Sequence, residues 1–222
     1  MSSLRLLMPP KGVLVPNDEQ DPLHYYYHRW IGWLYRHRLQ MGLKLLPAGG
    51  ERVLEVGVGS GVLVPTLTAR YREYTGTDLT LSAGLRGLVA PECKAEFLRA
   101  DLLQDDLPAD HYDAIVCFSV LEHISDSHAA ARRLAGALAP GGTLVCGYPM
   151  VSKLMSRAFT MIGYKHIDDD HVSAPAQITS ALADVLTPIG RHAFPPAAPP
   201  RAALYQCTAW TKRLEKASRS RA

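Results

Sequence analysis

Strand-like and helix-like segments alternate regularly between residues 51 and 149, and this alternation constrains the fold more than any other feature. Apolar stretches predict five strands, and the segments between them predict crossover helices. Parallel strands need such crossovers, so the pattern predicts a mainly parallel sheet with helices on both faces. The strands are expected at 51–57, 71–78, 94–101, 111–120 and 143–149, and the helices at 62–71, 81–90 and 125–140.

The flanking segments complete a seven-stranded sheet. A Trp- and Tyr-rich helix is expected over 23–46, where apolar residues recur at helical spacing, and a further helix over 175–187. Residues 189–212 predict two strands joined by a proline-rich turn, an antiparallel pair at the sheet edge. We therefore expect one domain over 21–213 with a lid-like insertion at 150–174. Residues 1–20, with three prolines, predict a loose extension, and 214–222 a basic tail.

Composition limits the classes of function. The net charge is +3 and the basic residues are spread along the chain, so no nucleic-acid partner is expected. No apolar run reaches about 18 residues, and the start MSSLRLLMPPKG falls short of a secretory signal. The four cysteines are far apart, without zinc-like spacing. Cys117 and Cys146 lie in apolar runs that predict strands, which favours buried thiols, and a reducing cytoplasm fits. The other two are Cys93 and Cys207.

A glycine-rich loop, VLEVGVGSG, follows the first strand of the alternating region. Its order is E-x-G-x-G-x-G, formed by Glu55, Gly57, Gly59 and Gly61. A dinucleotide-binding fingerprint would place a third glycine at Val62, so that interpretation is disfavoured. The loop resembles the first motif of the class I S-adenosylmethionine-dependent methyltransferases. That resemblance implies a Rossmann-like, doubly wound α/β fold with S-adenosyl-L-methionine as cofactor and S-adenosyl-L-homocysteine as product. It also implies that Glu55 and the three loop glycines contact the cofactor.

Later landmarks extend the resemblance over about residues 51–150, namely DAIVCFSVLEHISD and LAPGGTLVCGYP. They are similar to the broad group that contains quinone-biosynthesis and small-molecule methyltransferases. The resemblance implies that Asp78, followed by Leu79, binds the ribose hydroxyls, and that Asp101 with Leu102 lies near the adenine. It also implies that Ser119 borders the cofactor and that Tyr26 or Tyr27 reaches the methionine carboxylate. The alternative is that this aromatic stripe packs in the core.

Three histidines are candidate catalytic residues on the acceptor side. His123 follows the fourth strand of the alternating region, and His166 and His171 lie in KHIDDDHV. A neighbouring aspartate would raise the pKa of His171 and suit it to proton uptake. The alternatives are a capping or surface role for His123 and a solvated acidic loop for the other two. No acid set resembles a magnesium site, so no metal is expected.

The leading hypothesis is methyl transfer to an oxygen or nitrogen of a small, fairly apolar metabolite. A second hypothesis places the acceptor, a lipid or quinone head group, at a membrane surface, because the 23–46 helix is aromatic and Arg-bearing. A third is a non-catalytic cofactor-binding accessory subunit. The protein is expected in the cytoplasm, either free or peripheral at the membrane. The sequence makes no prediction of oligomeric state.

Overall fold

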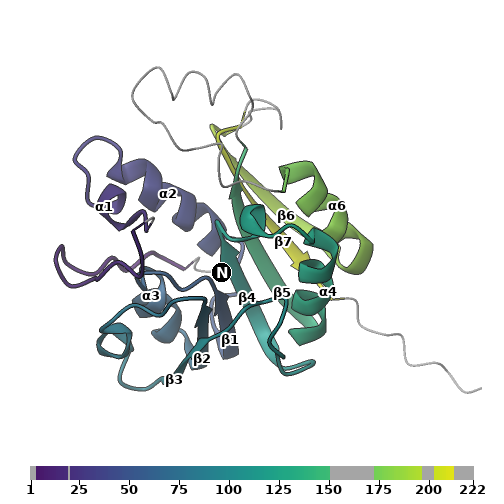
Figure 1. Cartoon of the computed structure of the whole chain (residues 1–222), viewed down its shortest axis with the longest axis horizontal. Coiled ribbons are helices and arrows are strands. Elements are labelled where there is room, and N and C mark those ends of the chain that lie inside the picture. The colour runs from purple at the N-terminus through teal and green to yellow at the C-terminus, as the bar shows by residue number, and fades with distance from the viewer. Residues whose placement is uncertain (1–3, 20, 151–172, 197–202, 213–222) are drawn as a thin grey trace, which may run out of the picture.

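A computed structural model describes residues 4–19, 21–150, 173–196 and 203–212. Seven strands form one twisted sheet in the order β3-β2-β1-β4-β5-β7-β6 (Figure 1). Strand β7 is antiparallel to both neighbours and the other pairings are parallel, so the expected mainly parallel sheet with an antiparallel pair at its edge is confirmed. The strands are β1 Gly50–Val56, β2 Tyr71–Asp78, β3 Lys94–Arg99, β4 Tyr112–Phe118, β5 Leu138–Pro149, β6 Thr187–Phe194 and β7 Tyr205–Thr211.

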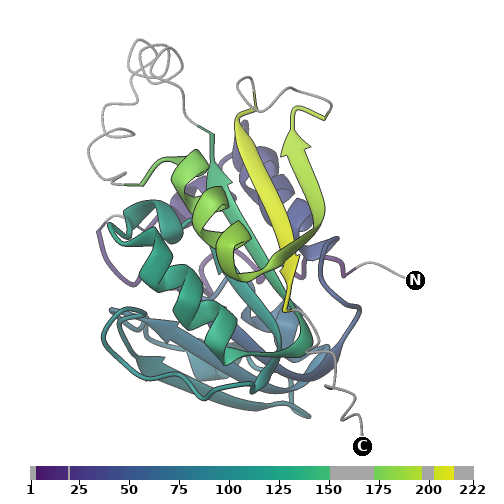
Figure 2. The same ribbon diagram turned by 90° about the vertical axis from the view of Figure 1, so that its right-hand side faces the viewer.

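Helices cover both faces of the sheet, as the alternation predicts. In Figure 1, α1, α2 and α3 lie on one side of the sheet, and α4 and α6 lie on the other. Figure 2 shows α4 and α6 packed next to each other over the central strands. The helices are α1 Leu23–Tyr26, α2 Gly32–Leu43, α3 Val64–Thr68, α4 Ser127–Ala137 and α6 Pro175–Val185, with 3-10 turns η1 Leu85–Leu88 and η2 Leu121–His123.

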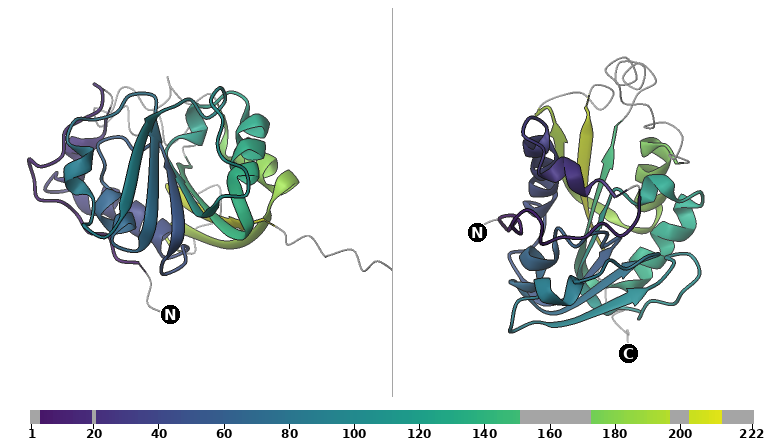
Figure 3. Two further views of the ribbon diagram at one scale, coloured as in Figure 1. Left: turned by 90° about the horizontal axis from the view of Figure 1, so that it is seen from below. Right: turned by 60° about the vertical axis from the view of Figure 1, so that its left-hand side comes forward.

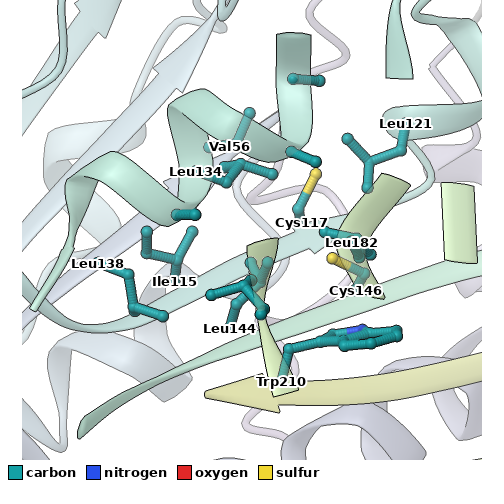
Figure 4. Packing of buried hydrophobic residues seen from close by; sticks show 14 of the residues in the cluster. Val56, Ile115, Cys117, Leu121, Leu134, Leu138, Leu144, Cys146, Leu182 and Trp210 are labelled. Atoms are coloured by element: carbon teal, nitrogen blue, oxygen red, sulfur yellow. The ribbon is translucent and has the colours of Figure 1, made fainter. Parts of the chain in front are cut away.

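Side chains of the central strands divide between two cores because successive residues of a strand point to opposite faces. In β4, Ala114 and Val116 belong to the core under α2 and α3. Ile115 and Cys117 belong to the core under α4 and α6 (Figure 4). All four are almost fully buried, so β4 is the centre of both apolar layers.

The order of the strands creates a switch point at β1 and β4. These two strands pair in parallel, yet the chain leaves β1 towards β2 on one side and leaves β4 towards β5 on the other. In open α/β sheets, ligands bind beyond the carboxyl ends of the strands at such a point. The glycine-rich loop directly follows β1, so the fold places it at this position.

The single helix expected over 23–46 is interrupted. It is divided into α1 and α2. Between them, the ring Nδ1 of His28 lies 3.3 Å from the backbone nitrogen of Trp30 and 3.4 Å from that of Ile31. A β-carbon on Gly32 would lie 2.8 Å from the carbonyl oxygen of Tyr26. The glycine therefore allows the two pieces to meet closely, a tertiary requirement that helical periodicity does not reveal.

Two other expected helices are much shorter than predicted. The helix expected over 62–71 is only α3, five residues long, and the one expected over 81–90 is the 3-10 turn η1. Gly84 precedes η1 with a φ of +84°, a left-handed conformation that ends regular structure. The Thr68 hydroxyl donates to the Val64 carbonyl, a local bond that competes with helix continuation.

The N-terminal segment differs most from expectation, because residues 4–19 are packed and not loose. Leu4 and Leu14 are buried in the same core as α2. Gln40 of α2 accepts from the backbone N–H of Leu6 and donates to the carbonyl of Leu4. The Ser82 hydroxyl donates to the carbonyl of Val15. In Figure 3 this segment, drawn in purple, lies on the side of the sheet that carries α2 and α3.

Helix α2 approaches the sheet closely because two glycines leave room for an aromatic ring. A β-carbon on Gly42 would lie 2.3 Å from the Phe118 ring, and one on Gly147 would lie 2.4 Å from it. The ring therefore fills the space between α2 and β5. Close packing of this kind tolerates added atoms poorly.

Replacing Gly42 by alanine should therefore destabilise the protein, with overpacking costing about 1–3 kcal/mol. Gly136 is a matched control, because it is exposed on α4 and a β-carbon there would meet no atom within 4 Å. Gly136→Ala should stabilise by about 0.5–1 kcal/mol. Urea unfolding measures both changes, and equal stability of the two variants would contradict the packing described here.

Candidate functional site: a cofactor loop and an adjoining acceptor face

The glycine-rich loop adopts backbone conformations that other residues rarely reach. Gly57, Gly59 and Gly61 have φ angles of +79°, +51° and +85°. The N–H groups of Gly57 and Val58 both donate to the Thr77 carbonyl of β2, at 2.8 and 3.1 Å. These bonds hold the turn against the neighbouring strand, so the loop is fixed at the carboxyl ends of the strands.

The three glycines have different spatial requirements. A β-carbon on Gly57 would lie 2.2 Å from Val120 Cγ2, and one on Gly61 would lie 2.6 Å from Leu85 Cδ2. On Gly59 it would meet only Asp21 Oδ2, at 3.9 Å. Gly57 and Gly61 therefore permit close packing. Gly59 borders open space, as expected where backbone and ligand approach each other.

Asp78 connects the loop to the end of β2. Its Oδ2 accepts from the Gly59 N–H at 2.8 Å, and its Oδ1 accepts from the Thr80 N–H at 3.3 Å. The side chain of Asn17 approaches Oδ1 at 3.4 Å. The carboxylate therefore lies beside Gly59 at the switch point, where a ribose is expected.

The N-terminal segment contributes groups that sequence reasoning missed. The Ser60 hydroxyl is 3.3 Å from Asp21 Oδ1, and the Asn17 N–H donates to Asp21 Oδ2. Burial raises the pKa of the Asp21 carboxyl. Asn17 and Asp21 lie in a polar stretch with no periodicity, so no local signal links them to the loop.

The Glu55 side chain is buried and hydrogen-bonded within the fold. Only 4% of it is exposed, and the Tyr74 hydroxyl donates to its Oε2 at 2.6 Å. Burial raises the pKa of the carboxyl to about 8, so it is mainly protonated at neutral pH. The sequence predicted cofactor contact here. The structure places the side chain against β2, where its bond with Tyr74 holds β1 and β2 together.

A surface hollow of about 280 Å³ lies beyond the carboxyl ends of β2 and β3. Asp101 Oδ1 accepts from the Leu103 N–H at 2.8 Å, which fixes the turn after β3. Leu102 is buried in the core under α4 and α6. The hollow brings together Leu79, predicted next to the ribose-binding Asp78, and Asp101, predicted near the adenine. Arg99, Ala100 and Asp105 complete its lining.

Ser119 directly follows β4, on the side where the acceptor is expected; the surroundings of Ser119 are called the expected acceptor face. Its φ is +55°, a strained conformation for a residue other than glycine. Its N–H donates to the Gly147 carbonyl at 2.7 Å, and its hydroxyl is 3.2 Å from the Tyr205 hydroxyl. Such strain is characteristic of functional sites, and Ser119 adjoins Val120, which packs against Gly57.

An arginine surrounded by tyrosines lies on this face and was not predicted. The Arg38 guanidinium is 4.4 Å from the ring centre of Tyr35 and 5.5 Å from those of Tyr26 and Tyr205. Its Nη2 donates to the Tyr26 hydroxyl at 2.9 Å. The Tyr26 hydroxyl predicted to bind the methionine carboxylate is therefore bonded to Arg38, and the residue packs in the core under α2.

Glu122 and His123 end this face on η2. Glu122 is 3% exposed, and burial raises the pKa of its carboxyl to about 7. His123 is exposed. His166 and His171 lie outside the described residues, as does most of the expected insertion at 150–174. Within the described residues, no group of three His, Cys, Asp or Glu side chains could hold a metal ion.

The sheet order, the glycine loop after β1 and the carboxylate ending β2 define a Rossmann-like fold of the methyltransferase class. A family model described as a methyltransferase domain matches residues 4–184. The chain therefore belongs to that family, among the class I S-adenosylmethionine-dependent methyltransferases.

Curated relatives are methyltransferases as well. An uncharacterised methyltransferase of Mycobacterium bovis is 35% identical over 101 residues, which are 45% of this chain and 51% of the relative. A ubiquinone biosynthesis O-methyltransferase of Idiomarina loihiensis is 32% identical over 134 residues, 58% of this chain and 52% of the relative. The chain thus spans about half the length of the curated relatives it matches.

Solved structures share the fold. The N-methyltransferase NodS of Bradyrhizobium japonicum, solved with S-adenosyl-L-homocysteine, has a TM-score of 0.61 and 19% identity, covering 89% of this chain and 94% of that one. The [4+2]-cyclase SpnF has a TM-score of 0.63 and 15% identity, covering 91% and 89%. At these identities the likeness concerns the fold alone.

Replacing Asp78 by alanine should weaken binding of S-adenosylhomocysteine. Loss of charge-assisted bonds to the ribose, and of the bond to Gly59, costs on the order of 1.5–3 kcal/mol, or roughly 10- to 150-fold in Kd. Isothermal calorimetry measures the affinity, and thermal unfolding shows whether the variant is folded. Unchanged affinity in a folded variant would exclude Asp78 from the site.

Glu55 should make stability depend on pH. Its folded pKa of about 8 lies above the ordinary 4.5, so the folded state retains a proton that the unfolded state has lost. Stability therefore falls as pH rises between these values, by up to about 1.4 kcal/mol per pH unit. In Glu55→Gln this contribution should vanish from urea unfolding measured at pH 6 to 9. The same slope in a folded variant would contradict the assignment.

Proposed function

We propose that the protein transfers a methyl group from S-adenosylmethionine to an oxygen or nitrogen of a small, fairly apolar acceptor. The observation that carries this proposal is the left-handed glycine loop beside Asp78 at the β1–β4 switch point. Family membership over residues 4–184 supports it independently.

The described residues fit the proposed cofactor. Gly59 leaves open space for the methionine part, Asp78 offers acceptors for ribose hydroxyls, and the hollow beside Asp101 suits the adenine end. The bound cofactor supplies an electrophilic methyl group on a positively charged sulfur. The chain's task is to align the acceptor with that group and to exclude water.

The test uses methyl-labelled S-adenosylmethionine, the purified protein and a cell extract. The extract is separated into small-molecule, organic-soluble, RNA and protein fractions after reaction. The proposal predicts label in the small-molecule or organic-soluble fraction. Label in RNA or protein would contradict the acceptor class. Absence of label with protein that binds the cofactor would favour an accessory subunit, or a different reaction on the same fold.

A second candidate is methylation of a lipid or quinone head group at a membrane surface. Trp30 and Trp33 are 69% and 53% exposed, and Arg29 lies 5.0 Å from the Trp30 ring centre. Exposed tryptophans beside a cation suit an interface between lipid and water. Among the described residues, no helix is both long and apolar enough to cross a bilayer.

Flotation with anionic vesicles tests this second candidate. The wild-type protein should float with the vesicles, and Trp30→Ala with Trp33→Ala should reduce the floating fraction because both aromatic contacts are lost. Arg132→Met, an exposed substitution on α4, is the matched control. Wild-type protein that stays at the bottom of the gradient would exclude the membrane version.

A further inference from the structure

Two buried side-chain atoms lack a hydrogen-bond partner among the described residues: Arg38 Nε, a donor, and Glu122 Oε2, an acceptor. A buried polar atom without a partner costs about 1–3 kcal/mol. The two belong to one neighbourhood, because the Arg38 charge acts on Glu122 and both groups act on Tyr205. Both lie around Tyr205, whose ring centre is 5.5 Å from the Arg38 guanidinium and whose hydroxyl is 3.2 Å from that of Ser119, near Glu122 in the chain.

The Arg38 side chain is held in a defined orientation. Its guanidinium contacts three tyrosine rings, and the bond from Nη2 to Tyr26 limits its rotation further. None of the salt bridges among the described residues involves Arg38. The positive charge is thus fixed beside aromatic surface without a hydrogen-bonded counter-ion, an arrangement suited to stabilising negative charge on a ligand.

Arg38 and Glu122 lie around the segment that follows β4, which also contacts the glycine-rich loop. Glu122 is on η2, directly after the half-buried residues Ser119 and Val120 at the end of β4. Val120 packs against Gly57 of the cofactor loop. Tyr205, beneath Arg38, is 3.2 Å from the Ser119 hydroxyl. The pair and the loop therefore share one edge of the sheet.

We propose that Arg38 and Glu122 together bind a hydroxyl group of the acceptor, so that the reaction is O-methylation of an acidic hydroxyl such as a phenol. A hydroxyl is both donor and acceptor, so it satisfies Glu122 Oε2 and Arg38 Nε at once. An amine would bring a second positive charge towards Arg38 whenever it is protonated. The inference rests on the proposed methyl transfer and specifies its substrate class.

In the reaction, the acceptor O–H proton moves to the Glu122 carboxylate. The oxygen's electron pair forms the new C–O bond to the methyl carbon. The C–S bond breaks at the same time, and the electrons of that bond remain on sulfur, which becomes part of a neutral thioether. Arg38 stabilises the negative charge that develops on the oxygen. Glu122 then releases the proton to solvent, so the products are a methyl ether, the thioether and one proton.

Glu122 is suited to this proton transfer at neutral pH. Burial raises the pKa of its carboxyl to about 7, so the base form becomes abundant above that pH. The titratable groups around it are Arg38 on α2, His123 on η2, Cys117 on β4, Cys146 on β5 and Tyr205 on β7.

The test measures ligand binding and not turnover. The wild-type protein, saturated with S-adenosylhomocysteine, is titrated with 4-nitrophenol and followed by the absorbance of the phenol and phenolate bands. It is titrated in parallel by calorimetry with 4-nitroanisole, which has the same ring but no O–H. We expect 4-nitrophenol to bind at least tenfold more tightly. Equal affinity for the two, or no binding of 4-nitrophenol, would overturn the proposal without requiring a variant.

Variants then assign the effect to the pair. Arg38→Met and Glu122→Gln should retain affinity for S-adenosylhomocysteine within about twofold and lose at least tenfold in affinity for 4-nitrophenol. Arg132→Met and Glu92→Gln, both exposed, are the controls and should change neither affinity. Unchanged 4-nitrophenol binding in folded Arg38 and Glu122 variants would mean that the pair is structural. Failure of the wild type to bind S-adenosylhomocysteine would instead contradict the proposed function.

Discussion

The pairing of β1 with both β2 and β4 is the constraint on which the rest of the structure depends. It places the amide groups of Gly57 and Val58 under the Thr77 carbonyl and brings Gly57 against Val120. At Gly57 the loop after β1 must therefore turn within a space too small for a side chain. The same contact joins the glycine-rich loop to the segment after β4, so the proposed cofactor and acceptor sites both depend on the close approach of Gly57 to Val120.

Two buried carboxyl groups illustrate how similar physics produces different roles. Burial raises the pKa of both Glu55 and Glu122. Glu55 has a partner in the Tyr74 hydroxyl and lies between two strands, so its hydrogen bond is satisfied within the fold. Glu122 Oε2 has none among the described residues, and the Arg38 charge acts on this carboxyl. The difference in partners, not in pKa, separates a structural carboxyl from a candidate site.

Local signals made the sheet and the cofactor loop predictable. Apolar runs identify strands, and the spacing of Gly57, Gly59 and Gly61 with Asp78 specifies a turn between two of them. The interrupted helix before β1 was not predictable in the same way, because it depends on contacts of Gly32 and His28. The same holds for the packed N-terminal segment and for Arg38, whose tyrosine partners come from three separate parts of the chain.

We propose that the loop beside Asp78 is a site for a sulfonium cofactor and not for a dinucleotide. Hydrogen exchange of the wild-type protein, measured with and without S-adenosylhomocysteine and with NADH as comparison, tests this assignment. We expect S-adenosylhomocysteine to slow exchange of amides in residues 57–61 and 78–80, and NADH to leave it unchanged. Protection by NADH alone, or no protection of these amides by either ligand, would contradict it.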